Sequence, residues 1–348
     1  PSGIHQARVE LRLQPNGSVK ASIDIQLRAL NHAPTTTKPR VLVIGMDGVR
    51  PDALALAYTP HIDQLARRGT SSYSASTQLS SSTVSAAGWH SIFTGVEPTK
   101  HRVTVNGIYD RLDRAYPTFF ARAQRELALT SAVAINWVPI LDHLIEENAL
   151  NFRATGTDQE VTDAMVQAII GGDNAIHFVH LDDVDHSGHE SGFDPYNEYY
   201  IRAIEGNDTM VGSLVDAISQ RPDVANESWL VVWVTDHGGS GRNHGERILT
   251  HQRIPQIVAG PDAIRRSVDG GNHMDIHPTI MQHLGLSPRD AWDLDGTIFG
   301  LPLLAETDCT DEFDDDQDGL IDCDDPDCSA ADACVPVADI CPGEDIGQ

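Results

Sequence analysis

The chain has 348 residues, of which 40% are hydrophobic and 6% aromatic, and its formal net charge is −27 at pH 7. A chain of this length can bury a full core, and one large α/β domain is the first expectation. The excess of acidic residues repels polyanions, which excludes nucleic-acid binding as the main role. No run of 18 or more apolar residues occurs, so the sequence predicts no membrane span.

Composition divides the chain into three parts, which we expect to be residues 1–38, 39–305 and 306–348. In the first part, apolar residues alternate on both sides of Asn16-Gly17, a pattern typical of a β-hairpin. We expect this hairpin to add an edge to the main sheet. The third part is an acidic, cysteine-rich tail.

The middle part alternates between strand and helix patterns. This indicates an α/β fold with a mostly parallel central sheet and helices on both faces. Ligands of such folds bind beyond the carboxyl ends of the strands, so the residues that follow each strand are the first candidates for a site. Strands are predicted at 41–44, 131–135, 176–181, 230–234 and 254–258, and helices at 60–66, 118–127, 158–170 (capped by Asp158) and 196–218.

Three predicted strands end in carboxylates and imidazoles. Asp47 follows the first of them, Asp185 and His189 follow the third, and Asp236 and His237 follow the fourth. These are ligand types that zinc and manganese prefer. A single Asp after a strand is more often a turn or cap residue. Three strand ends that deliver such groups to one rim of the sheet favour a metal site.

These motifs, with the hydroxyl-rich segment 79–95, resemble the signature of the alkaline phosphatase superfamily, most closely its type I phosphodiesterase/nucleotide pyrophosphatase branch. The resemblance covers about residues 40–302, and the motifs occur in the family order. It implies an alkaline phosphatase-like fold and metal-dependent hydrolysis of phosphate esters. The residues that carry it are Asp47-Gly48, Ser85 to Gly95 followed by Pro98 and His101, Asp185-x-x-Gly-His189 and Asp236-His237-Gly238, with further matches at Pro60 to Ala66, Ile254 to Pro261 and Asp275 to Ile280.

The same resemblance implies roles for individual residues. Ser85 is the expected nucleophile, and Asn106 is expected to contact a phosphoryl oxygen, although an ordinary Asn-Gly turn is the alternative for Asn106. Two divalent metals are implied, zinc in the first place and manganese as the alternative. The expected ligands are Asp47, Ser85, Asp236 and His237 for one metal, and Asp185, His189 and a third histidine for the other.

The third histidine has three candidates. His244 lies in Arg242-Asn243-His244-Gly245, which fits a form seen in part of the superfamily. His273 lies where the nucleotide pyrophosphatase branch takes its ligand. His251 precedes the last predicted strand, as in the phosphoglycerate mutase-like branch. We favour His244.

A serine hydroxyl is a poor nucleophile at neutral pH, and coordination to a divalent cation stabilises its deprotonated form. We therefore expect hydrolysis of a small-molecule, lipid or nucleotide phosphate ester through a phosphoserine at position 85. No arginine near Ser85 is evident to bind a dianionic monoester, which favours phosphodiesters. Ala87 and Trp89 stand where sulfatases carry Pro and Arg. Trp89 either stacks on a leaving group or packs beneath its helix.

Other functions stay open at this point. A phosphomonoesterase or a phosphoryl-group transferase of the same superfamily would carry the same motifs. A catalytically inactive surface binding protein is the alternative from another class. The sequence leaves the substrate and the oligomeric state undetermined.

The acidic tail holds all five cysteines, and from residue 306 onward it has 16 Asp or Glu and no Lys or Arg. Clustered cysteines without paired C-x-x-C units favour disulfides over a zinc knuckle, and hence a secreted, periplasmic or cell-surface protein. The segment 314–325 resembles an EF-hand-like calcium loop with glycine at its sixth position. The expected calcium ligands are Asp314, Asp316, Asp318, Leu320, Asp322 and Asp325.

Overall fold

The chain forms two compact units, Pro1–Lys38 and Pro39–Gln348, in a computed structural model. The structure describes residues 4–12, 19–28, 37–107, 109, 112–303, 309–310, 321–325, 328 and 334. In the first unit, strand β1 (Ile4–Arg12) pairs antiparallel with β2 (Val19–Arg28), which confirms the hairpin, although Asn16-Gly17 lies outside the described residues. The expected addition to the main sheet is wrong, because among the described residues β1 and β2 pair only with each other.

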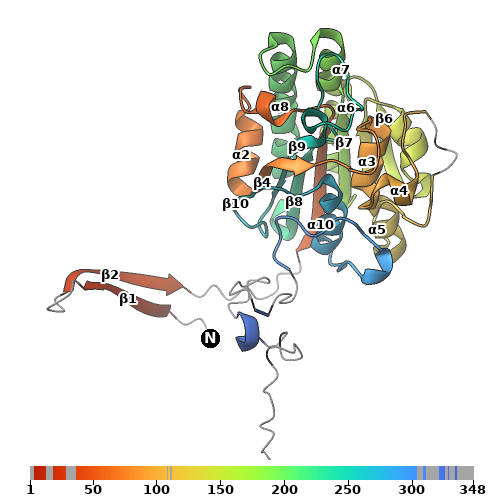
Figure 1. Ribbon diagram of the computed structural model, residues 1–348. Coiled ribbons are helices and arrows are strands. Elements are labelled where there is room, and N and C mark those ends of the chain that lie inside the picture. Colours follow the sequence, from red (N-terminus) through yellow and green to blue (C-terminus); the bar gives the residue numbers. More distant parts are fainter. Residues whose placement is uncertain are drawn as a thin grey trace, which may run out of the picture. The chain divides into compact units, whose positions relative to one another are not determined.

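The second unit is built on an eight-stranded sheet with the order β10-β4-β9-β8-β3-β7-β5-β6 (Figure 1). Parallel pairing joins β3 to β7, β7 to β5, β5 to β6 and β10 to β4, which confirms a mostly parallel α/β sheet. Strand β9 is the exception, because it runs antiparallel to both β4 and β8. The strands are β3 (Lys38–Met46), β4 (Gly69–Ser76), β5 (Ser131–Ile135), β6 (Leu150–Thr155), β7 (Ile176–Leu181), β8 (Glu227–Val234), β9 (Arg253–Ala259) and β10 (Arg266–Ser267).

Helices connect these strands, and the four predicted ones are present with ends that agree to within two residues. The α-helices are α1 (Pro51–Leu54), α2 (Pro60–Arg68), α3 (Ser85–Thr94), α4 (Pro98–His101), α5 (Phe119–Leu127), α6 (Asp158–Gly171), α7 (Asp183–Ser191), α8 (Glu198–Ser219), α9 (Leu249–Gln252) and α10 (Ile276–His283). Short 3₁₀ or π turns are η1 (Ile140–Leu144), η2 (Glu147–Ala149), η3 (Val224–Asn226), η4 (His273–Asp275), η5 (Asp290–Trp292) and η6 (Asp322–Asp324).

Two apolar layers lie on opposite faces of the sheet because side chains alternate along a strand. On the central strand β3, Val41 and Val43 face a core that includes side chains of α3, α5 and α10. Leu42 and Ile44 face a second core that includes side chains of α2, α6 and α8. Figure 1 shows these helix sets on the two sides of the sheet. Both cores leave the carboxyl ends of β3, β7 and β8 free to carry polar residues.

The start of α6 differs from the prediction. The N-cap is Thr157, whose hydroxyl accepts from the backbone N–H of Glu160, while the Glu160 carboxylate accepts from the N–H of Thr157. Asp158 is instead fully buried. Its two carboxylate oxygens accept from the backbone N–H groups of Asp182 and Asp183. Asp158 therefore anchors the beginning of α7, the helix that carries Asp185 and His189.

Several of the buried histidines in the described part of the chain have pKa values far below the ordinary range. Burial lowers the pKa of His101, His273 and His277 to about 3 and that of His177 to about 4. An unfolded histidine titrates near pH 6.5, so below that pH the unfolded chain binds protons that the folded chain excludes. Each such histidine makes unfolding easier by about 1.4 kcal/mol per pH unit as the pH falls from about 6.5 towards its folded pKa.

We expect the variant His273→Leu to weaken this acid sensitivity. His273 is fully buried and neither ring nitrogen has a hydrogen-bond partner among the described residues. Urea unfolding at pH 7.5, 6.0 and 5.0 measures how the free energy of unfolding changes with pH. The slope should fall by about one proton relative to the parent protein. Parallel pH curves for the two proteins would contradict a neutral, buried His273.

In the acidic tail, the predicted disulfides are present as Cys309–Cys328 and Cys323–Cys334, with Cα–Cα distances of 5.7 and 5.0 Å. Cys341 lies outside the described residues. So do Asp314, Asp316, Asp318 and Leu320, four of the six expected calcium ligands, and the calcium loop stays a prediction. No helix within the described part of the chain has the length and apolar character needed to cross a membrane.

Candidate active site

The carboxyl ends of three neighbouring strands carry the site. Asp47 follows β3, and Asp236 and His237 follow β8 after Thr235, while α7 starts two residues beyond β7 and presents Asp185. Gly48 allows the close approach, because its φ is +72° and a Cβ there would lie 2.7 Å from the Asp185 carboxylate. The strand ends therefore bring together acids that are up to 189 positions apart in the chain.

Each of the three carboxylates uses one oxygen within the protein, and the other makes no hydrogen bond to any residue that the structure describes. Asp236 Oδ1 accepts from the backbone N–H of Gly48, and Asp185 Oδ2 lies 3.3 Å from His189 Nε2. Asp47 Oδ2 accepts two hydrogen bonds. The remaining oxygens, Asp47 Oδ1, Asp185 Oδ1 and Asp236 Oδ2, are buried and have no hydrogen-bond partner among the described residues. Buried anionic oxygens of this kind fit a cation, because an unpaired buried charge is costly.

Three histidines complete the cluster, and their rings are held in the same orientation. The Nδ1–H groups of His189, His237 and His244 donate to the backbone carbonyls of Arg242, Gly238 and Thr83. A carbonyl only accepts, so Nδ1 carries a proton in each ring and Nε2 is the nitrogen that faces the carboxylates. The hydrogen bond with Asp185 and its charge raise the pKa of His189 to about 9, so Nε2 of His189 also carries a proton when no cation is bound. Metal-ligating histidines are commonly oriented in this way.

The Nε2 atoms of these histidines meet the free carboxylate oxygens. His237 Nε2 is 3.3 Å from Asp236 Oδ2 and 3.4 Å from Asp47 Oδ1, and His244 Nε2 is 3.7 Å from Asp185 Oδ1. His189 and His244 approach to 3.1 Å between their Nε2 atoms. Two ligand groups follow, Asp47-Asp236-His237 and Asp185-His237-His244, each with its ligand atoms within 4.8 Å of one another.

The two other histidine candidates lie apart from this cluster. His251 uses both ring nitrogens, since Nδ1 accepts from the N–H of Glu246 and Nε2 bonds the hydroxyl of Ser240 at 2.7 Å. His273 lies in η4 and is fully buried with both nitrogens unpartnered. Of the three, the structure brings only His244 to the carboxylates.

The electrostatics show how strongly the acids repel one another. Burial, and then the charges of Asp47 and Asp185, raise the pKa of Asp236 well above its ordinary value. Burial and the Asp47 charge also raise the pKa of Asp185. Burial alone would raise the pKa of Asp47 too, but the hydrogen bonds from His180 and Trp89 outweigh it and lower that pKa. A cation among these groups would relieve the repulsion.

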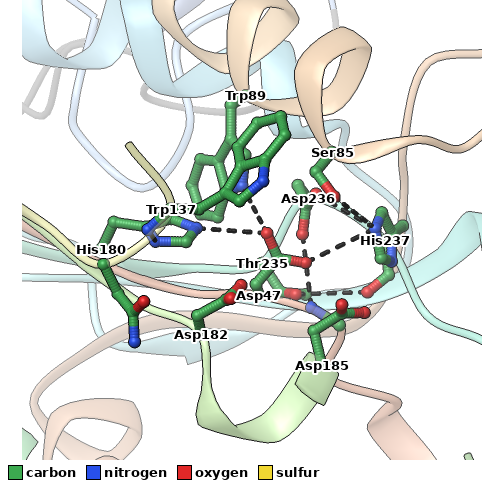
Figure 2. Close-up of polar contacts among 12 residues, drawn as sticks. Asp47, Ser85, Trp89, Trp137, His180, Asp182, Asp185, Thr235, Asp236 and His237 are labelled. Carbon is green, nitrogen blue, oxygen red and sulfur yellow. Dashed lines mark hydrogen bonds and ion pairs between the residues drawn. The ribbon is translucent and has the colours of Figure 1, made fainter. Parts of the chain in front are cut away.

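Ser85 lies at the first residue of α3, beside this cluster. Its hydroxyl donates to His237 Nε2 at 3.2 Å, and the residue is 6% exposed. Figure 2 shows Ser85, Asp236 and His237 on one side of Asp47. The helix N-terminus favours negative charge at this position. Ser85 is thus placed where an anionic group could meet both the helix and the metal-binding atoms.

Asn106 reaches the same helix start. Its Oδ1 accepts from the backbone N–H of Ala86 at 3.0 Å. Because a carbonyl oxygen makes that bond, the NH₂ group of the side chain remains as a donor. Asn106 therefore has more than a turn role, since its side chain is fixed next to Ser85 through the first turn of α3.

Around Asp47, sequence reasoning named Trp89 without its bond to Asp47, and it missed His180. Trp89 is fully buried and its indole N–H donates to Asp47 Oδ2 at 2.8 Å, so it does not stack on a leaving group. His180, at the end of β7, contacts the same oxygen at 3.1 Å. Asp47, His180 and Asp182 form a third group of clustered ligand atoms. The signal that could identify His180 is a polar side chain next to the last residue of a strand that is otherwise largely apolar.

Comparisons with known proteins agree with this geometry. The family model described as type I phosphodiesterase/nucleotide pyrophosphatase matches residues 41–155, and the metalloenzyme superfamily model matches residues 138–288. No curated protein sequence matches the chain.

Solved structures share the fold at low sequence identity. Mouse ectonucleotide pyrophosphatase/phosphodiesterase 5, solved as an inactive variant with AMP, is 14% identical, with a TM-score of 0.61 over 72% of this chain and 96% of that chain. A putative sulfatase from Bacteroides fragilis is 18% identical, with a TM-score of 0.60 over 76% and 77% of the two chains. A putative sulfatase from Bacteroides thetaiotaomicron is 15% identical, with a TM-score of 0.62 over 76% and 74%.

The family matches and the cluster of metal-binding side chains define a metal-dependent hydrolase of phosphoric or sulfate esters. More narrowly, the two models together cover the sheet and every strand end described above. The chain belongs to the alkaline phosphatase superfamily, in its phosphodiesterase/nucleotide pyrophosphatase-like branch.

Proposed function

We propose that the protein hydrolyses phosphodiesters with Ser85 as nucleophile and two bound divalent cations. The observation that carries the proposal is the convergence of three unpartnered, buried carboxylate oxygens and three oriented imidazoles next to the Ser85 hydroxyl. The proposed ligands are Asp47, Ser85, Asp236 and His237 for one cation, and Asp185, His189 and His244 for the other. Zinc is the proposed metal, because imidazoles and carboxylates in a compact site suit it.

In this proposal Ser85 Oγ attacks phosphorus, the Oγ–P bond forms as the bond to the leaving oxygen breaks, and the hydroxyl proton is released to solvent. The leaving alcohol takes up a proton, and water then cleaves the phosphoserine to give a monoester and free Ser85. Two divalent cations in such a site supply charge stabilisation to the attacking and leaving oxygens. The Asn106 NH₂ group donates to an equatorial oxygen of the phosphoryl group.

The charge of the site supports a diester substrate. Among the described residues, no lysine or arginine side chain forms an ion pair or hydrogen bond with Asp47, Ser85, Asp185, Asp236 or His237. A dianionic monoester would bring one more negative charge to this acid-rich site than a diester does. This chain has Ala87 and Trp89 at the positions where sulfatases carry Pro and Arg, which favours a phosphate ester over a sulfate ester. Solved relatives of the fold include both classes.

The test is a comparison of esters with the same leaving group. After treatment with a chelator and reloading with Zn²⁺, the protein is assayed on bis-p-nitrophenyl phosphate, p-nitrophenyl phosphate and p-nitrophenyl sulfate. We expect kcat/KM for the diester to exceed that for the others by about tenfold or more, which corresponds to about 1.4 kcal/mol in the transition state. Preference for the monoester would replace the diesterase proposal by a phosphatase. No turnover of any ester by zinc-loaded protein would favour an inactive binding protein.

We further propose that the protein works outside the reducing cytoplasm. Two disulfides cross-link the described part of the tail, and such bonds persist in oxidising compartments. A calcium ion in the loop 314–325 belongs to the same proposal, since the disulfides would hold the acidic loop in shape. Calcium-dependent protection of the tail from proteolysis would test it.

A further inference from the structure

Two side chains donate hydrogen bonds to Asp47 on the side away from the metal-binding cluster. Neither forms a hydrogen bond with any other proposed ligand among the described residues. Trp89 Nε1 lies 2.8 Å and His180 Nε2 lies 3.1 Å from the same oxygen, Asp47 Oδ2. All three side chains are at most 1% exposed. Figure 2 shows Trp89 and His180 approaching Asp47 from the side opposite His237. The other carboxylate oxygen, Oδ1, faces the metal-binding cluster.

Both contacts are donations to the carboxylate. An indole N–H has no acceptor function, so Trp89 can only donate. His180 Nδ1 accepts from the backbone N–H of Trp137, which leaves the ring proton on Nε2 for Asp47. Two donors on one oxygen fix the rotation of the carboxylate group. They leave Oδ1, which is buried and unpartnered, as the oxygen available to a cation.

The surroundings are shaped for the Trp89 ring. A Cβ on Gly45 of β3 would lie 2.5 Å from the far edge of the indole, so only glycine leaves space for it. A Cβ on Gly88 would lie 2.8 Å from Asp236 Cβ, so glycine also lets α3 pack against the end of β8. Trp89 follows Ser85 by four residues on the same helix and therefore lies on the same helix face. Its hydrogen bond thus ties the helix of the nucleophile to a ligand on β3.

We propose that Trp89 and His180 are positioning residues that fix Asp47 so that a single oxygen, Oδ1, binds the cation shared with Asp236 and His237. Trp89 also sets the distance between that cation and Ser85. The inference rests on the proposed function, because it assigns Asp47 as a metal ligand.

The test uses matched substitutions. Trp89→Phe removes the indole N–H, and Trp233→Phe is its control, because Trp233 is equally buried but donates to the sulfur of Met46. His180→Phe is compared in the same way with His177→Phe, a buried histidine on the same strand. Zn²⁺ binding is titrated calorimetrically into chelator-treated protein, and bound zinc is counted by mass spectrometry. Thermal unfolding of the metal-free variants reports on folding.

We expect Trp89→Phe and His180→Phe each to lower the affinity for one of the two zinc ions by about 10- to 100-fold. This is the usual effect of changing a residue that hydrogen-bonds a metal ligand. The second ion should bind as in the parent protein, and both control variants should bind two ions normally. If Trp89→Phe folds and binds both ions with parental affinity, the positioning role is overturned. If the control Trp233→Phe loses zinc equally, the effect is one of packing, which also overturns it. If the parent protein itself binds no zinc, the proposed function fails instead.

Discussion

Replacing Ser85 by alanine is expected to reduce diester turnover by about 10³-fold or more, because the attacking oxygen is lost while the other metal-binding side chains remain. Ser85 makes one side-chain hydrogen bond, to His237, and is not the N-cap of its helix. The fold should therefore survive the change. Steady-state kinetics on bis-p-nitrophenyl phosphate with zinc-loaded protein measures the effect. Rapidly quenched parent protein should also carry a phosphoryl group on the peptide that contains Ser85.

Ser91→Ala is the matched control for this variant. Ser91 lies on the same helix, is fully buried and bonds His101 at 2.9 Å, away from the metal-binding cluster. Its loss should cost stability, of the order of 1 kcal/mol for a hydrogen bond, and leave turnover largely unchanged. A Ser85→Ala protein with parental activity would remove Ser85 from the mechanism and point to direct attack by water.

Removing the metals is expected to lower thermal stability, and the loss should grow as the pH rises. In the metal-free protein, burial and neighbouring acids raise the pKa of Asp236 and Asp185, and raise that of Asp182 to about 7. A carboxyl group with a raised folded pKa stabilises the fold below its unfolded pKa of about 4, and this stability is lost as the pH rises through the folded value. Bound cations compensate the charges that form. The gap between zinc-loaded and chelated protein should therefore widen between pH 5.5 and pH 8.5.

Calorimetric unfolding at pH 5.5, 7.0 and 8.5, with chelator or with Zn²⁺, measures this gap. Zinc at 1,000 times its dissociation constant should add about 4 kcal/mol to the free energy of unfolding for each site. The acid sensitivity of the buried histidines is common to both forms and cancels in the difference.

Asp236→Asn is the control, since it removes one of the repelling charges. The chelated variant should be more stable than chelated parent protein at pH 8.5 and should gain less from zinc. Identical unfolding temperatures with and without zinc at pH 8.5 would contradict a metal centre here.

The fold was largely predictable where burial dictates composition. The apolar runs at 131–135 and 176–181 match β5 and β7 residue for residue, because a strand buried on both faces needs apolar side chains along its length. Strand β4 was missed, since its sequence GTSSYSAS has no apolar run. Its small hydroxyl residues can be buried because their side chains donate to backbone carbonyls far along the chain, as Thr70 does to Ile264 and Ser72 to Gly270. The residues of β9 likewise do not indicate that it runs antiparallel to its neighbours.

For the site, sequence reasoning located the strand ends and the serine helix but not the arrangement of side chains. The motifs place Asp47, Asp185 and Asp236 in the right order, and the structure brings them together as expected. The choice of His244 over His251 depends on the orientation of each ring. Both ring nitrogens of His251 are already hydrogen-bonded, one to Ser240 and one to Glu246. Trp89 could be read as substrate contact or as packing. Only its complete burial and the hydrogen bond from its indole N–H to Asp47 decide between the two.

By itself the sequence determined the class of fold, the disulfide-bearing tail and the set of residues from which a metal-dependent ester hydrolase is built. The class of fold and the disulfide-bearing tail follow from local composition and spacing, because burial and loop chemistry act on neighbouring residues. The set of site residues and the ester hydrolysis follow from the resemblance to the alkaline phosphatase superfamily. The tertiary structure decided which oxygen of each carboxylate is free, which histidine joins them and what holds Asp47 in place. Such choices depend on contacts between residues more than 40 positions apart, and their geometry is set by how strands and helices pack.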